Sequence, residues 1–279
     1  MLAPLVSIII PTKNSSNTFS QCLNSIKNQT YGNIEIIVVD NSSVDDTIDI
    51  AKRFTNLVFS YSPERSSQIN HGVKKSSGKY IYRVDSDFVL DPNVIMEAVN
   101  LAESNNLAAI LIHNTSDPTV SYWARVRKFE RDMYESEDLN VAVRFIRRDV
   151  FLALGGFDPE LIYGEDYDLH NRIIQKYEIG RINAKEMHLG EYKSLFEIAK
   201  KNYYYGKSAN KFLRKNKIRG VRQVNPFRST YFRNVNKFVQ HPILTGGFLI
   251  YQIIRYGAGI FGLLVTLIVN LSTRDNEDR

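Results

Sequence analysis

The sequence is poor in cysteine, because Cys22 is the single one among 279 residues. A disulfide within the chain and a cysteine-rich metal site are therefore both excluded. This usage suits a reducing compartment. The composition of 43% hydrophobic and 24% charged residues is that of a globular protein, and the length fits one large domain or a domain with an appendage.

Glycine-rich phosphate-binding loops are also missing after the strand-like runs of the sequence. Neither the G-x-G-x-x-G nor the G-x-x-x-x-G-K-[ST] pattern follows any strand-like run in residues 5–146, so a dinucleotide-binding or P-loop function loses its main support. The N-terminal stretch MLAPLVSIIIPTKN has no basic leader, and its apolar run is short and contains prolines. We interpret it as a first strand rather than a signal peptide.

Acidic residues are scarce in one block of the chain. Residues 193–237 contain thirteen Lys or Arg and one acid, Glu197, a net charge of +12. The whole chain carries +6, so the remainder is acidic. This asymmetry predicts an anionic partner, such as a membrane surface, a phosphorylated lipid or nucleic acid.

Apolar runs alternate with helical patterns over the first part of the chain. Strand-like runs cover 5–10, 34–39, 57–61, 79–84, 107–112 and 141–146. Helical patterns cover 18–28, 44–54, 66–75, 94–105, 122–134, 148–154 and 165–176. The early strands are apolar on both sides, which predicts an α/β fold with a Rossmann-like, mostly parallel sheet between two layers of helices.

Polar side chains follow the early strands. Asp85-Ser86-Asp87 comes directly after the strand at 79–84, and two carboxylates at this spacing can converge on Mg²⁺ or Mn²⁺. A solvated acidic turn is the simpler alternative. However, Thr12 and Asp40 end two earlier strands, and ligands of such sheets bind beyond the carboxyl ends of the strands. The pattern therefore favours a binding site at this edge.

A second carboxylate pair, Glu165-Asp166, follows Gly164. Acids in the first turn of a helix ordinarily complement its dipole. The functional alternative is that Asp166 or Glu165 is a general base that faces the site.

The stretches VSIIIPTKN, VVDNSS, ERSSQINHG, YRVDSD and GFDPELIYGEDYDL, in this order, resemble the family 2 glycosyltransferases with the GT-A fold. The resemblance covers about residues 5–190. It implies transfer of a sugar from a nucleotide-diphosphate donor to an acceptor with inversion at the anomeric carbon. It also implies a donor site that contains Pro11, Thr12, Asp40, Asp85 and Ser86. Of these, Pro11 and Thr12 would border the nucleotide pocket, Asp40 would hydrogen-bond the base, and Asp85 would contact the ribose or the metal.

The resemblance also assigns the metal and the base. Asp87 would bind a divalent cation, Mg²⁺ or Mn²⁺, that bridges the diphosphate, and Asp166 of the Glu165-Asp166 pair would deprotonate the acceptor. His188 would complete the metal site, or it is an ordinary loop histidine. Arg65 would touch the diphosphate, or it is a surface residue.

The last third of the chain differs from the rest. We expect a catalytic domain at 1–192, a basic aromatic helical segment at 193–240, and an apolar membrane-associated segment with a short polar tail at 241–279. Arg255 is the single formal charge between residues 242 and 273. A helix near 249–271 would span a membrane, lie in its interface, or be a buried core helix.

The basic block before this segment favours a membrane over nucleic acid, with the catalytic domain on the cytoplasmic face of the cell membrane. The partners expected are a nucleotide-sugar donor and a lipid-linked or polyprenyl-phosphate acceptor. Two other functions remain open, a metal-dependent nucleotidyltransferase and a non-catalytic membrane-anchored scaffold.

Overall fold

The structure is a computed structural model that describes residues 3–61 and 64–277. The chain forms two compact units. Unit 1 comprises the chain up to Thr115, with 141–159 and 165–190, and unit 2 comprises 116–140, 160–164 and the chain from Glu191 onward. The three-part division at residues 192 and 240 stays a prediction.

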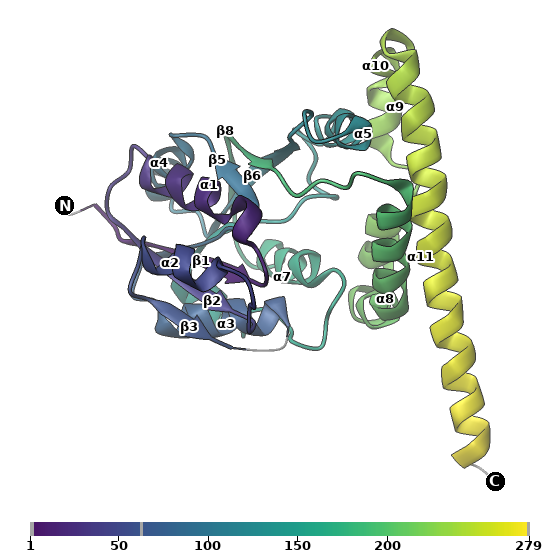
Figure 1. The fold of residues 1–279 in the computed structure, drawn as a ribbon, viewed down its shortest axis with the longest axis horizontal. Coiled ribbons are helices and arrows are strands. Elements are labelled where there is room, and N and C mark those ends of the chain that lie inside the picture. The colour runs from purple at the N-terminus through teal and green to yellow at the C-terminus, as the bar shows by residue number, and fades with distance from the viewer. Residues whose placement is uncertain (1–2, 62–63, 278–279) are drawn as a thin grey trace. The chain divides into compact units, whose positions relative to one another are not determined.

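Unit 1 is built on a sheet that has eight strands in the described part of the chain, in the order β3-β2-β1-β4-β7-β6-β8-β5 (Figure 1). The strands are β1 Val6–Thr12, β2 Ile34–Asp40, β3 Val58–Ser60, β4 Tyr80–Arg83, β5 Phe88–Leu90, β6 Ala109–Ser116, β7 Phe145–Arg147 and β8 Ile179–His188.

The sheet is parallel in one part and antiparallel in the other. Strands β3, β2, β1 and β4 run parallel, whereas β7 is antiparallel to both β4 and β6, and β5 is antiparallel to β8. Residues 84–87 are too short a link for a parallel crossover, so β5 leaves the parallel part and pairs with β8. The predicted α/β class with flanking helices is confirmed, and the sheet is mixed rather than parallel throughout.

Helices cover both faces of the sheet. They are α1 Ser16–Lys27, α2 Thr47–Lys52, α3 Arg65–Lys75, α4 Val94–Asn105, α6 Arg148–Ala153 and α7 Glu165–Ile174. Alternate residues of β1 point to opposite faces. Ile8 packs with residues of α1 and α4, and Ile9 packs with residues of α3, α6 and α7. Both faces of the central strands are therefore buried, and the polar strand ends are left at the edge.

Unit 2 is helical. Its helices are α5 Tyr122–Arg131, α8 Leu195–Val224, α9 Ser229–Arg233, α10 Val235–Gln240 and α11 Pro242–Glu277. Phe129 of α5, Ile198 of α8 and Phe248 of α11 share one apolar core, and α8 and α11 lie side by side (Figure 1). In the described part of the chain, the stretch at Pro242–Val269 is the one that is long and apolar enough to cross a membrane.

Candidate active site

Asp85, two residues after β4, lies among three arginines. Its Oδ2 is 3.0 Å from Arg144 Nη2 and 3.9 Å from Arg83 Nη2, and its Oδ1 is 3.5 Å from Arg65 Nη1. Burial alone would raise the pKa of Asp85, but the guanidiniums of Arg144, Arg83 and Arg65 outweigh it and hold that pKa far below its usual range. Asp85 is therefore ionised and contacts three guanidinium groups.

Arg144 is fixed from the interior of unit 1. Its Nε is 2.7 Å from Glu186 Oε1, and Tyr82 donates a hydrogen bond of 2.8 Å to the other oxygen of Glu186. The side chain of Arg144 is 5% exposed and that of Glu186 is fully buried. This buried arginine, directly before β7, is tolerated because it has two carboxylate partners. Arg144 therefore links the Asp85 carboxylate to the buried Glu186 carboxylate.

Replacing Arg144 with methionine should destabilise the protein by about 3–5 kcal/mol, because the change removes the cation beside the fully buried Glu186 and one of the three cations beside Asp85. Arg147, three residues later in β7, provides a matched control, since it pairs with Asp149 at the surface. Arg147→Met should cost at most about 1 kcal/mol. Urea unfolding followed by far-UV circular dichroism measures both values. Equal losses in the two variants would contradict this account of Arg144.

Asp87 and His188 face each other across two strands. Phe88 is in register with His188 in the antiparallel β5–β8 pair, and Asp87 Oδ2 is 3.0 Å from His188 Nε2. Gly190 lies against this carboxylate, since a Cβ on Gly190 would be 2.2 Å from Asp87 Oδ2. The Asp87 carboxylate therefore occupies space that a side chain at position 190 would fill.

The Asp87–His188 pair fits a divalent cation. Two neighbouring ligands at about 2.1 Å from an octahedral ion lie about 3 Å apart, which is the separation of the two atoms here. Among residues 3–61 and 64–277, no group of three or more His, Cys, Asp or Glu is arranged to hold a metal. A pair of protein ligands is sufficient where substrate phosphates and water supply the rest.

Glu165 and Asp166 open α7, and Arg65 connects them to the Asp85 cluster. The Nη2 of Arg65 pairs with Glu165 Oε1, while its Nη1 contacts Asp85. Burial raises the pKa of Glu165, although Arg65 opposes the rise. Asp166 is partly exposed and accepts a hydrogen bond of 2.8 Å from the Tyr167 amide. The two carboxylate motifs, eighty residues apart, thus meet through one guanidinium.

The ends of β1 and β2 form a buried polar corner. Asp40 accepts hydrogen bonds from the Thr12 hydroxyl at 2.9 Å and from the hydroxyl and amide of Ser43 at 2.5 and 2.7 Å. An ionised carboxylate accepts about four hydrogen bonds, so Asp40 keeps room for one more. Gln68 donates to the carbonyls of Thr12 and Val39 and ties both strands to α3.

The other predicted residues of the donor site lie nearby in unit 1. Pro11 is buried within β1, directly before Thr12. Ser86 donates a hydrogen bond of 2.8 Å to the Ser15 hydroxyl, which holds the Asp85–Asp87 turn against the start of α1. The roles of Pro11, Thr12, Asp40 and Ser86 toward a nucleotide stay predictions.

Four residues that the sequence reasoning did not assign belong to this region: Arg83, Arg144, Gln68 and Gly190. One signal was available, since a charged residue inside the apolar run YIYRV is costly unless it is paired. The partners of Arg144 and the neighbour of Gly190 are distant in sequence, so their positions required the fold.

Comparisons with known proteins agree with this arrangement. The glycosyltransferase RP339 of Rickettsia prowazekii (strain Madrid E) is 31% identical over 185 residues, 60% of this chain and 58% of that protein. The O-antigen chain rhamnosyltransferase WbaN of Salmonella anatum is 27% identical over 197 residues, 62% of this chain and 61% of that protein. The chain thus spans less than two thirds of these relatives' lengths.

Solved structures show the same fold. The mannosyltransferase PcManGT from Pyrobaculum calidifontis, in complex with GDP-Man and Mn²⁺, matches with a TM-score of 0.65 at 15% identity. The match covers 96% of this chain and 88% of that one. The predicted GT-A type of fold is confirmed.

The match to a family profile covers more than half of the chain. Residues 7–153 match the profile described as glycosyl transferase family 2. This range includes β1, β2, β4 and the Asp85-Ser86-Asp87 turn. The chain belongs to glycosyl transferase family 2.

Proposed function

We propose that this protein transfers a sugar from a nucleoside-diphosphate sugar to an acceptor, with inversion at the anomeric carbon. The observation that carries the proposal is Arg65, which contacts both Asp85 and Glu165. It joins the aspartate turn to the start of α7, so a group that holds a leaving diphosphate and a group that takes a proton lie in one region of unit 1.

The chemistry needs one displacement. The acceptor oxygen forms the new bond to the anomeric carbon while the bond from that carbon to the diphosphate breaks, and the acceptor proton passes to Asp166. Asp166 is the base in this proposal because Glu165 is 3% exposed and is paired with Arg65. No covalent nucleophile is required for inversion.

The leaving group gains negative charge as it departs, and groups already in place stabilise that charge. Arg65 is 42% exposed, so it can turn toward a diphosphate while Asp85 stays anchored by Arg144. Asp87 and His188 would hold Mg²⁺ or Mn²⁺, which when bound neutralises the diphosphate charge. PcManGT, described with Mn²⁺ and GDP-Man, supports this choice of cofactor and donor class.

The function is tested by the release of nucleoside diphosphate from a panel of nucleotide sugars, with Mn²⁺ and with a chelator. The panel includes GDP-mannose and a nucleotide-linked rhamnose, because similar proteins carry the names mannosyltransferase and rhamnosyltransferase. Metal-dependent turnover of one donor supports the proposal. Release of pyrophosphate from a nucleoside triphosphate and a sugar phosphate would instead identify a nucleotidyltransferase. The absence of both reactions would favour a scaffold.

Gly190→Ala should raise the Mn²⁺ concentration needed for half-maximal turnover by about 10- to 100-fold. The new methyl group would displace the Asp87 carboxylate, whose oxygen lies 2.2 Å from the Cβ position. Gly32→Ala is the control, because a Cβ on Gly32 meets nothing within 4 Å. If both variants show the Mn²⁺ dependence of the unmodified protein, the contact between Gly190 and Asp87 does not position a metal ligand.

The proposed acceptor is a lipid-linked saccharide or polyprenyl phosphate at the cytoplasmic face of a membrane. Support comes from the basic segment at 193–237 and from the apolar α11 that follows it. Transfer to a lipid-linked saccharide in vesicles should exceed transfer to the same saccharide in water. Equal transfer to the two acceptors would contradict this part of the proposal.

A further inference from the structure

Helix α11 presents an uncharged apolar stripe to solvent. The exposed side chains are spaced mostly by three, four or seven residues, which places them on one side of the helix, and the exposed fractions of Ile243, Ile253 and Ile268 are 78%, 71% and 65%. The other members of the stripe are Ile250, Ile260, Phe261 and Leu264. Soluble surfaces seldom carry so large a continuous apolar patch, and one of this kind marks a contact with another molecule or a membrane.

The opposite side of α11 packs on α8 at backbone distance. A Cβ on Gly206 would be 2.0 Å from the carbonyl oxygen of Gly259, and one on Gly262 would be 2.2 Å from that of Tyr203. The pairs 206–259 and 203–262 run in opposite directions, so the helices are antiparallel. Gly206, Gly259 and Gly262 thus allow the backbones of α8 and α11 to pack in direct contact.

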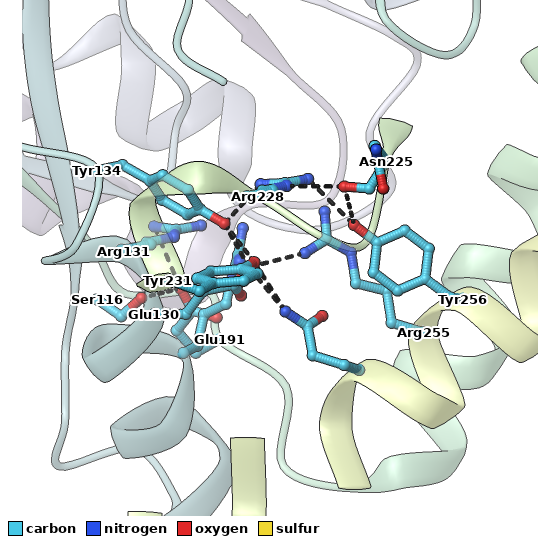
Figure 2. A network of polar contacts seen from close by, with 12 residues as sticks. Ser116, Glu130, Arg131, Tyr134, Glu191, Asn225, Arg228, Tyr231, Arg255 and Tyr256 are labelled. Carbon is cyan, nitrogen blue, oxygen red and sulfur yellow. Dashed lines mark hydrogen bonds and ion pairs between the residues drawn. The ribbon is translucent and has the colours of Figure 1, made fainter. Parts of the chain in front are cut away.

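A polar network fixes the first half of α11 to the rest of unit 2 (Figure 2). Arg255 donates to Glu130 of α5 at 3.1 Å, and Gln252 donates to Glu130 at 3.3 Å and to Tyr231 of α9 at 2.9 Å. Burial alone would raise the pKa of Glu130, but Arg127 and Arg255 outweigh it and hold that pKa well below its usual range. Glu130 is therefore an ionised partner of Arg255.

A spanning α11 is incompatible with these contacts. Helix α8 carries nine Lys or Arg, and it would have to enter hydrocarbon together with α11, where each such charge is strongly unfavourable. If α11 left α8 instead, Arg255 would enter hydrocarbon and Glu130 would lose a buried ion-pair partner. Both routes oppose a transmembrane position.

We propose that α11 lies in the plane of an anionic membrane surface, with the stripe Ile243–Ile268 in the headgroup region and its other face on α8 and α5. The exposed lysines of α8, such as Lys200, Lys207 and Lys211, give the pair of helices a positive charge, which favours an anionic surface. This inference rests on the membrane location within the proposed function, and it replaces a spanning helix with a surface-bound one.

The side of the membrane on which the chain ends tests the inference. Full-length protein with Asn183→Cys or Ser272→Cys is expressed in bacteria, and sealed vesicles with the cytoplasmic face outward are treated with an impermeant maleimide. Cys22 is fully buried and provides a silent background. We expect both new cysteines to react before detergent is added. Reaction of Ser272→Cys only after detergent would establish a spanning helix and overturn the inference, while the proposed sugar transfer would stand.

The stripe itself is tested with liposomes. Replacing Ile253, Ile260 and Ile268 together with glutamine should weaken binding to phosphatidylglycerol vesicles by about 100-fold or more, since each replacement removes an exposed apolar side chain that the proposal buries in the membrane. Leu152→Gln is the control, because Leu152 is an exposed apolar residue of unit 1. Donor hydrolysis by the triple variant should be unchanged. Undiminished vesicle binding by that variant would overturn the inference, and failure of every variant to hydrolyse a donor would overturn the proposed function instead.

Discussion

Asp166→Asn should lower sugar transfer by about 10²- to 10⁴-fold while donor binding is retained, because an amide cannot take the proton of the acceptor hydroxyl. The variant keeps the shape of the side chain and the hydrogen bond from the Tyr167 amide. Single-turnover transfer measures the chemical step, and equilibrium titration with the nucleotide sugar measures the donor affinity. A loss confined to the chemical step distinguishes a base from a residue that binds the donor.

Asp149→Asn is the matched control for Asp166→Asn. Asp149 is also an acid in the first turn of a helix, α6, and it pairs with Arg147 at the surface. Both variants lose one favourable interaction with a helix dipole, about 0.3–1 kcal/mol, so this contribution cancels in the comparison. Asp149→Asn should retain normal transfer. Normal transfer by Asp166→Asn would remove Asp166 from the mechanism.

Glu165 and Asp166 are neighbours with different surroundings. Glu165 is buried and pairs with Arg65, whereas Asp166 is partly exposed at the start of α7. Pairing with Arg65 leaves Glu165 poorly placed to receive a proton from a substrate. We therefore assign Glu165 to holding Arg65 in place and Asp166 to proton transfer, and the sequence alone did not separate the two.

The apolar strands were predictable because burial on both faces leaves a clear pattern. Strands β1, β2 and β4 appear in the sequence as mainly apolar runs, and Thr12, Asp40 and Asp85, at or just after their ends, lie where parallel strands predict. Strand β5 has only three residues, and β8 reads IGRINAKEMH with five polar or charged residues. Neither strand has a periodicity that distinguishes it from a loop, so His188 was left open between a metal ligand and a loop residue.

The chemical division within the aspartate turn was less predictable. Asp85 and Asp87 have the same side chain two residues apart, yet Asp85 faces three arginines and Asp87 faces His188 and Gly190. Arg144, directly before β7, and His188, at the end of β8, are each more than fifty residues from the turn in sequence. The spacing of the two acids identified a candidate metal site, and the pairing of β4 with β7 and of β5 with β8 gives each acid its partner.

Asp87→Asn should lower metal-dependent turnover by about 10³-fold or more at limiting Mn²⁺, because a neutral amide replaces the carboxylate that pairs with His188. Protein stability should change little, since the Asp87 side chain is 31% exposed. Turnover is measured over a range of Mn²⁺ concentrations, together with the midpoint of urea unfolding.

Asp91→Asn is the control for Asp87→Asn. Asp91 follows β5 by one residue, and its carboxylate accepts a hydrogen bond of 2.9 Å from the Lys185 amide, so it belongs to the same strand pair without facing His188. Its substitution should leave the Mn²⁺ dependence unchanged. If Asp87→Asn and Asp91→Asn both turn over the donor normally at limiting Mn²⁺, the metal is not held by Asp87, and the leaving diphosphate must be stabilised by the arginines around Asp85 instead.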